Sequence, residues 1–197
     1  MAAYISQFFM VGIPAALVFA CFAPYRMRAM YAQKLASGPL REAGLYLFMV
    51  CLFGLAALLL WPRYAWWNGN LIILNARESL TDGVNWEPLY MIRVYLDAIE
   101  SGDWNMGKFL FGNVAVFMPL GFFPPLLFRG QRFRHILCLG LGYSLTAETL
   151  QFFLGRHCDV DDVLLNVVGT VLGYWVYLLL KRLSPALVPR FRCGKMK

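Results

Sequence analysis

A short segment in the last quarter of the chain concentrates side chains that can do chemistry. Residues 155–162 read Gly-Arg-His-Cys-Asp-Val-Asp-Asp, so three carboxylates and one guanidinium fall within seven positions. Asp159, Asp161 and Asp162 could hold a divalent cation that activates a phosphoryl or acyl group, while Arg156 suits a phosphate or carboxylate. A plain solvated loop is the alternative, and a lone loop histidine such as His157 is more often incidental than a ligand.

The polar pattern continues from this segment into the apolar run that follows. Asp162, Asn166, Gly169 and Gly173 follow one another at spacings of four, three and four, which places them on one face of a helix. The two glycines form a small-xxx-small pair that lets another helix approach closely. Helix packing explains the glycines but not the polar pair, although Asp161 or Asp162 near a helix start also suits capping.

A second polar face precedes the segment. Gly140, Ser144, Glu148 and Gln151 are four, four and three residues apart, so they also share one helical face. An ionised, unpaired carboxylate inside a membrane costs several kcal/mol, so we expect Glu148 to face the bundle, pair with a cation or be protonated. A satisfied contact between helices is the alternative to a site. If the two faces meet, they close a polar pocket that opens to the outside.

These polar groups lie in a chain with the composition of a membrane protein, because 60% of its residues are hydrophobic and only 15% are charged. A spanning helix needs about 20 mostly apolar residues. Five runs meet this requirement: 5–23, 43–62, 109–128, 136–154 and 163–180. We therefore expect an all-α integral membrane protein with five transmembrane helices. A cleaved signal peptide would need a basic start, which the first run lacks.

Charge is distributed unevenly among the connections. The connections after the first and third runs, together with the tail, carry thirteen basic residues against one acid, Glu42. The other connections carry five basic residues against nine acids. Because basic residues in short loops stay in the cytoplasm, we expect an outside amino terminus and a cytoplasmic carboxyl terminus in a bacterial inner membrane. Attraction to anionic membrane lipids explains the net charge of +7 without a nucleic acid partner.

The predicted organisation has three parts: two helices with a basic loop in 1–62, an outer segment with three helices in 63–183, and a basic cytoplasmic tail in 184–197. The outer connection is rich in tryptophan, and its apolar residues Leu89, Ile92, Leu96 and Ile99 repeat at helical spacing. This pattern predicts a short interfacial or re-entrant helix. The five cysteines show neither a disulfide framework nor clustered metal-ligand spacing.

Four passages of the sequence resemble the VanZ-like family of bacterial membrane proteins. They are Val-Asn-Trp-Glu-Pro-Leu at 84–89, Asn-Val-Ala-Val-Phe-Met-Pro-Leu-Gly at 113–121, Glu-Thr-Leu-Gln at 148–151, and the segment from 155 to 166 with its continuation to Gly169. The last passage is the most specific. In the first, Trp86 and Glu87 replace the apolar pair that the family usually has. The resemblance extends from residue 84 to about 177 and leaves the first two helices outside it.

The resemblance implies a site without naming its chemistry. The family's founding member is associated with low-level resistance to the glycopeptide antibiotic teicoplanin, and the biochemical activity of its relatives is not settled. The family's recurrent positions correspond here to Asn113, Pro119, Gly121, Glu148, Gln151, Arg156, Asp159, Asp161, Asp162, Asn166 and Gly169.

Three functions are compatible with this pattern. The first is binding of an amphiphile, such as a lipid-linked envelope intermediate or a lipoglycopeptide, by Asn113, Glu148, Gln151, Arg156, Asp159, Asp161, Asp162 and Asn166. The second is an enzyme acting on a lipid-linked phosphate or acyl substrate, with Glu148 as general base and Asp159 and Asp162 as further catalytic candidates. The third is a small transporter with Glu148 as a proton-coupled site. No Ser-His-Asp, HExxH or P-loop spacing is present, so the sequence does not specify a reaction class. The oligomeric state is left open.

Overall fold

The computed structural model describes residues 2–60, 63–67, 70–74, 84–154 and 158–195. These residues form six α-helices: α1 Ala2–Ala32, α2 Pro39–Leu60, α3 Tyr90–Glu100, α4 Trp104–Leu127, α5 Phe133–Phe153 and α6 Val160–Leu183. The short strands are β1 Leu35–Ala36, β2 Arg63–Trp67, β3 Asn70–Leu74, β4 Val84–Asn85, β5 Cys158–Asp159 and β6 Gly194–Lys195. A 3-10 helix, η1, covers Val188–Phe191.

Four of the helices, namely α2, α4, α5 and α6, are long and apolar enough to cross a membrane. The prediction of a helical, multi-pass membrane protein is therefore confirmed. The fifth predicted span corresponds to α1, a helix of 31 residues with two internal prolines, Pro14 and Pro24. The count of five spans depends on this helix and stays a prediction.

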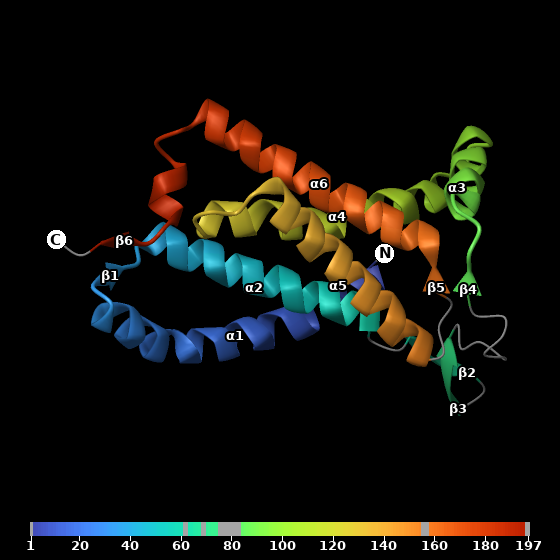
Figure 1. Ribbon diagram of the computed structural model, residues 1–197. Helices are drawn as coiled ribbons and strands as arrows, with labels where there is room; N and C mark the ends of the chain where they lie inside the picture. Colours follow the sequence, from blue (N-terminus) through green and yellow to red (C-terminus); the bar gives the residue numbers. More distant parts are fainter. Residues whose placement is uncertain (1, 61–62, 68–69, 75–83, 155–157, 196–197) are drawn as a thin grey trace.

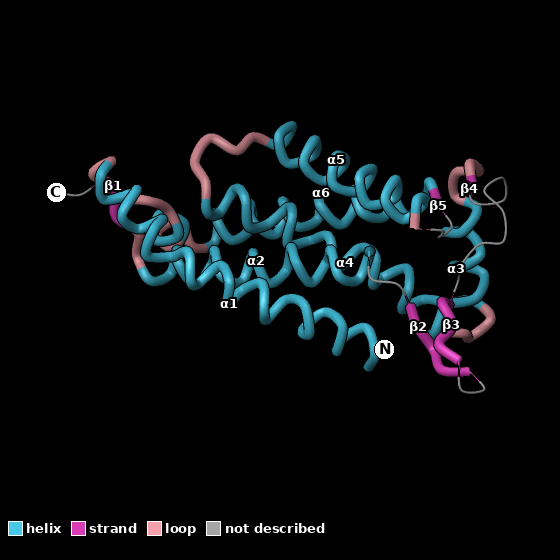
Figure 2. The backbone as a smooth tube through the Cα atoms, turned by 90° about the horizontal axis from the view of Figure 1, so that it is seen from below, coloured by secondary structure: helices cyan, strands magenta, loops and turns pink. Residues whose placement is uncertain are grey.

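The helices pack as a bundle in which α4 and α6 lie side by side and α5 packs on α6 (Figure 1). Helix α2 packs on α4, and α1 lies at the periphery alongside α2 in both views (Figure 2). One end of the bundle carries α3, β4 and β5, and we call it the site end. The opposite end carries β1 and β6, and we call it the tail end (Figure 1).

Glycines bring α4 and α6 into backbone contact. A Cβ atom added to Gly169 would lie 2.1 Å from the carbonyl oxygen of Val114, and one added to Gly173 would lie 1.9 Å from that of Met118. On α4, Gly121 lies equally close to the backbone of α6. Since such contacts leave no room for a side chain, the small-xxx-small pair serves the packing of α6 against α4. This close crossing fixes the depth at which the polar residues of both helices meet.

The carboxyl-terminal segment packs across the tail end. Val188 is buried against Leu126 and Tyr177, and β6 pairs antiparallel with β1 between the first two helices. The Arg192 guanidinium donates to the carbonyl oxygen of Pro125 at 2.9 Å and to the Tyr177 hydroxyl at 3.1 Å. The basic tail thus connects α4 and α6 to the segment between α1 and α2.

The connection between α2 and α4 contains the predicted short helix and an unpredicted hairpin. Helix α3 contains the apolar repeat from Ile92 to Ile99, while Leu89 is its N-cap residue. None of the described residues of α3 is buried. Strands β2 and β3 pair antiparallel with Arg63 opposite Leu74. The aromatic and β-branched residues of these strands suit both a membrane interface and a hairpin, so composition alone does not separate the two.

Candidate functional site

The site begins where two distant segments pair. Strand β4 runs parallel to β5, with Val84 opposite Cys158 and Asn85 opposite Asp159. The Asn85 side-chain amide lies 3.4 Å from each carboxylate oxygen of Asp159. The pairing fixes the connection before α3 against the start of α6. Two of the passages that resemble the VanZ-like family therefore meet at the site end (Figure 1).

Asp161 attaches α3 to α6. Its carboxylate accepts hydrogen bonds from the backbone N–H groups of Leu89 at 2.5 Å, Met91 at 2.8 Å and Ile92 at 3.1 Å. The first N–H groups of a helix have no partner within the helix, and no side chain of the N-cap residue Leu89 supplies one. A buried carboxylate from another helix thus performs the capping that a local Ser or Asp usually performs.

Asp159 and Asp162 are also held by specific partners. Asp159 is the N-cap of α6, and its Oδ1 accepts the backbone N–H of Asp161 at 2.9 Å. Asp162 accepts the side-chain amide of Asn113, on α4, at 2.8 Å. The three aspartates therefore connect α6 to β4, to α3 and to α4 respectively. The capping of α6 that the sequence suggested for Asp161 or Asp162 is performed by Asp159, whereas Asp161 caps α3.

Deeper in the bundle, the two predicted polar faces meet. The Asn166 amide on α6 donates to the Ser144 hydroxyl on α5 at 2.9 Å, and both residues are buried. Glu148 is only 4% exposed, and its Oε2 accepts the backbone N–H of Asp159 at 3.2 Å. Gln151 is buried on the same face of α5. Glu148 and Asn166 thus lie on the same side of the bundle, in one interface that excludes lipid.

Burial and nearby carboxylates raise the pKa values of two other acids at this end of the bundle. Burial raises the pKa of the Cys158 thiol to about 12, and the charge of Glu148, to which the thiol is hydrogen-bonded, adds to the effect. The pKa of Tyr95 on α3 is also raised, first by burial and then by the charges of Asp162, Asp159 and Asp161. Both shifts favour the neutral side chain, as expected for acids placed beside other acids.

Among the described residues, the candidate metal ligands Asp159, Asp161 and Asp162 are not arranged as a metal site. The described residues contain no group of three His, Cys, Asp or Glu side chains arranged to hold a metal ion. Both oxygens of Asp161 accept backbone N–H groups, and one oxygen of Asp159 does the same. Arg156 and His157, expected at the same loop, lie outside the described residues.

Sequence reasoning missed two contributors to the site. Asn85 stood in one of the family passages, but nothing in its local sequence indicated a partner 74 positions away. Tyr95 carried no signal beyond the helical repeat of α3, and only the packing of that helix places it near the aspartates. Ser144 was expected on the polar face, and the structure adds its partner, Asn166.

With this geometry described, the chain can be compared with known proteins. The family model described as VanZ/LLP1 matches residues 45–181, well over half of the chain. The match begins within α2, so the expectation that both amino-terminal helices lie outside the family region is wrong for the second helix. Helix α2 packs on α4 and α5, which explains why it belongs with the helices that carry the site. No curated protein and no solved structure matches the chain.

Proposed function

This chain belongs to the VanZ/LLP1 family, and we propose that it binds an amphiphilic, lipid-linked intermediate of the bacterial cell envelope at its site end. The family and the four apolar helices make it a multi-pass membrane protein. The proposal assigns the polar head of the ligand to the residues around β5 and the start of α6. Its hydrocarbon part lies at the depth of the apolar helices.

The buried polar interface between α5 and α6 is the observation that carries this proposal. Each polar group inside a membrane span has an energetic cost, and glycine alone would be enough for close packing. The chain nevertheless places Ser144, Glu148 and Asn166 in that interface, and Glu148 accepts the backbone N–H of Asp159 at the site end. A surface of this kind is favourable where it is shared with a polar ligand.

The chemistry of the site suits a head group rich in hydroxyl and amide donors. Carboxylate and amide oxygens of Glu148, Asp159, Asp162, Asn113 and Gln151 are acceptors for such donors, as in a saccharide or a short peptide. We assign Arg156, from the same loop in sequence, to a phosphate or carboxylate of the ligand. Asp161 holds α3 in place by hydrogen bonds, and Asn166 donates a hydrogen bond to Ser144 of α5. Both residues therefore affect ligand binding through the geometry of the site.

Helix α3 suits a place at the membrane surface. Its exposed residues include Tyr90 and Leu96, and Trp86 just before it is 76% exposed. Amphipathic aromatic side chains of this kind favour the headgroup layer. The excess of basic residues in the other connections supports an orientation with this end of the bundle outside the cell, where glycopeptide antibiotics and exported envelope intermediates both occur. A role in glycopeptide resistance would follow from binding either of them.

Binding by the purified protein in phosphatidylcholine nanodiscs tests this function. Fluorescent polyprenyl diphosphate N-acetylglucosamine and labelled teicoplanin are titrated separately, so that the two ligands are distinguished. We expect Arg156→Ala and Asp162→Asn each to weaken binding of the recognised ligand about tenfold, as loss of one charge-assisted hydrogen bond predicts.

Two matched control variants carry the same types of substitution, Arg to Ala and Asp to Asn, at residues outside the proposed site. Arg134→Ala removes an exposed arginine in the first turn of α5, and Asp97→Asn removes an exposed carboxylate of α3. Both controls should bind as the unchanged protein does. Equal affinity of all four variants, with unchanged circular dichroism, would show that the ligand does not use this site.

A further inference from the structure

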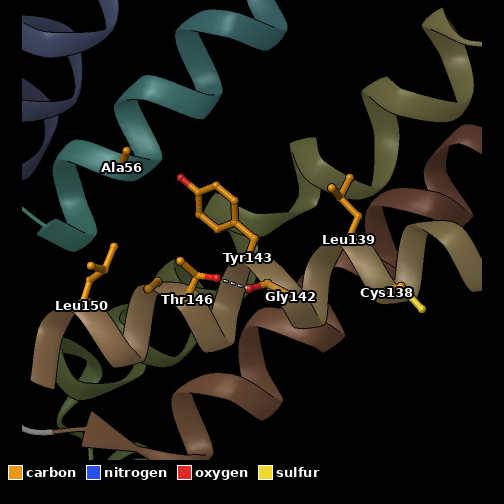
Figure 3. A pocket seen from close by; sticks show the side chains of 8 residues that line it. Ala56, Cys138, Leu139, Gly142, Tyr143, Thr146 and Leu150 are labelled. Carbon is orange, nitrogen blue, oxygen red and sulfur yellow. Dashed lines mark hydrogen bonds between the residues drawn. The ribbon is translucent and has the colours of Figure 1, made fainter.

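A groove between α2 and α5 has no role in the site described so far. Its volume is about 370 Å³, and it is lined by Ala56 of α2 and by seven residues of α5 between Cys138 and Leu150 (Figure 3). Tyr143 reaches from α5 toward α2, and its hydroxyl donates to the carbonyl oxygen of Leu52 at 3.4 Å (Figure 3). The groove therefore lies between two helices that are long and apolar enough to span the membrane.

Both hydroxyl groups that line the groove already donate hydrogen bonds within the protein. The Thr146 hydroxyl donates to the carbonyl oxygen of Gly142 at 2.7 Å within α5 (Figure 3). The Tyr143 hydroxyl donates to the carbonyl oxygen of Leu52 on α2. The remaining lining is made of aliphatic side chains, a glycine and a thiol. Gly142 has open space where a side chain would be. This lining suits hydrocarbon and has nothing to recognise a polar compound.

The position of the groove relates it to the site end. The lining residues of α5 span twelve helical steps, which correspond to about 18 Å along the axis of the helix. One leaflet of a hydrocarbon core is about 15 Å thick. Its outer end is formed by Ala147 and Leu150, which directly precede the buried site residues Glu148 and Gln151 in the chain. The groove is thus about as long as one leaflet is thick, it is centred on the middle of α5, and its outer end reaches the depth of the polar interface.

We propose that this groove holds the hydrocarbon chain of the amphiphile whose polar head binds at the site end. The inference rests on the proposed function and specifies the ligand further, because it requires a hydrocarbon chain long enough to follow the groove for about 18 Å along α5. The protein then recognises a lipid-linked compound by two surfaces that share one helix: its buried polar face for the head and its groove face for the chain.

Photocrosslinking in phosphatidylcholine nanodiscs tests the groove. The probe is polyprenyl diphosphate N-acetylglucosamine with a diazirine in its isoprenoid chain, and crosslinked peptides are mapped by mass spectrometry. We expect labelling within 138–150 and near Ala56 that an excess of unlabelled compound suppresses. Gly142→Phe and the milder Gly142→Leu should reduce this labelling and the affinity about tenfold by filling the groove.

Gly112→Phe is the matched control, because Gly112 on α4 also has open space at its Cβ position. It should leave the labelling unchanged. A diazirine-bearing phosphatidylcholine that labels the groove as strongly as the probe, without competition by the unlabelled compound, would overturn the inference in favour of bulk lipid. Crosslinks from the groove to a second copy of the chain, or to α1, would overturn it in favour of a protein occupant.

The two proposals fail in different ways. If Gly142→Phe and Gly142→Leu bind the probe normally while Asp162→Asn and Arg156→Ala weaken binding, the groove assignment is wrong and the proposed head site stands. If suppressible labelling of the groove persists while the head-site variants bind normally, the head site is wrong and the groove still binds a chain.

Discussion

The carboxylate of Asp161 accepts the backbone N–H of Leu89 at 2.5 Å, across 72 positions of sequence. Two further N–H groups at the start of α3 use the same carboxylate. Helix α3 lies at the site end and has no buried residue among those described. The cap joins α3 to α6, and α3 also packs on α4 where Ile99 lies against Gly107. Together these contacts determine where Tyr95 and the exposed aromatic residues lie.

Replacing Asp161 by alanine should loosen α3 while the bundle remains folded. The change removes three charge-assisted hydrogen bonds and should cost about 2–4 kcal/mol of stability. Asp161→Asn keeps one acceptor oxygen and should cost about half as much. Hydrogen exchange of amides 89–100 measures the effect, with Asp97→Ala on the exposed face of α3 as control. Unchanged exchange in Asp161→Ala would show that other contacts hold the helix.

Replacing Gly173 by alanine should disrupt the packing of α4 on α6. The added Cβ would lie 1.9 Å from the Met118 carbonyl oxygen, so one helix must move away from the other. We expect a loss of at least about 3 kcal/mol, seen as a lower unfolding temperature in detergent. Gly112→Ala, which meets open space, should be neutral or stabilise by up to about 1 kcal/mol. A tolerated alanine at Gly173 would contradict the close crossing.

A double-mutant cycle isolates the hydrogen bond between Asn166 and Ser144. Asn166→Ala and Ser144→Ala should each destabilise the protein, with a coupling energy of about 1 kcal/mol, as found for hydrogen bonds between helices in membranes. Steric-trapping measurements in bicelles give the four unfolding free energies. Additive effects would mean that the two residues contribute independently and that the polar faces do not act together.

Cys158 should resist alkylation well into the alkaline range. Its pKa is raised to about 12, whereas an unfolded thiol has a pKa of about 8.5. At pH 9 a variant carrying Cys158 alone should react with iodoacetamide at least about a hundredfold more slowly when native than when unfolded in SDS. Glu148→Gln removes one cause of the shift and should speed the native reaction. Equal native and unfolded rates would contradict this environment.

The same shift predicts how the Cys158 contribution to stability depends on pH. Because the folded pKa lies above the unfolded one, the native state keeps the proton that the unfolded state releases between pH about 8.5 and about 12. The contribution is therefore fully present below pH about 8.5 and is lost as the pH rises toward 12. Replacing Cys158 by serine should flatten the alkaline fall in the unfolding free energy. An identical alkaline profile would contradict the assignment.

Glu148→Gln also separates binding from catalysis. The glutamine keeps an acceptor in the buried interface, so a binding protein should retain its ligand with an affinity within about threefold. An enzyme that uses Glu148 as its general base should lose about a hundredfold or more of its turnover. Thin-layer analysis of radiolabelled polyprenyl diphosphate N-acetylglucosamine after incubation with each protein gives the answer. Turnover that depends on Glu148 would replace the binding proposal with the enzymatic one.

Much of the fold follows from local sequence, because lipid imposes a simple requirement on each segment separately. A run of about 20 apolar residues satisfies its backbone within one helix, so α2, α4, α5 and α6 were predictable from composition and length. The polar faces of α5 and α6 were likewise predictable from their spacing. Periodicity also indicated α3, since its apolar residues recur at helical spacing before any neighbour is known.

Tertiary structure alone decided which of these residues meet. The cap that Asp161 places on α3, the parallel pairing of Asn85 with Asp159, and the packing of the tail through Val188 all join segments far apart in the chain. Such contacts produce no repeating pattern within a short stretch of sequence, so the spacing of residues does not predict them. The groove beside Gly142 has the same origin, since apolar residues facing lipid and those facing a cavity look alike until two helices are placed side by side.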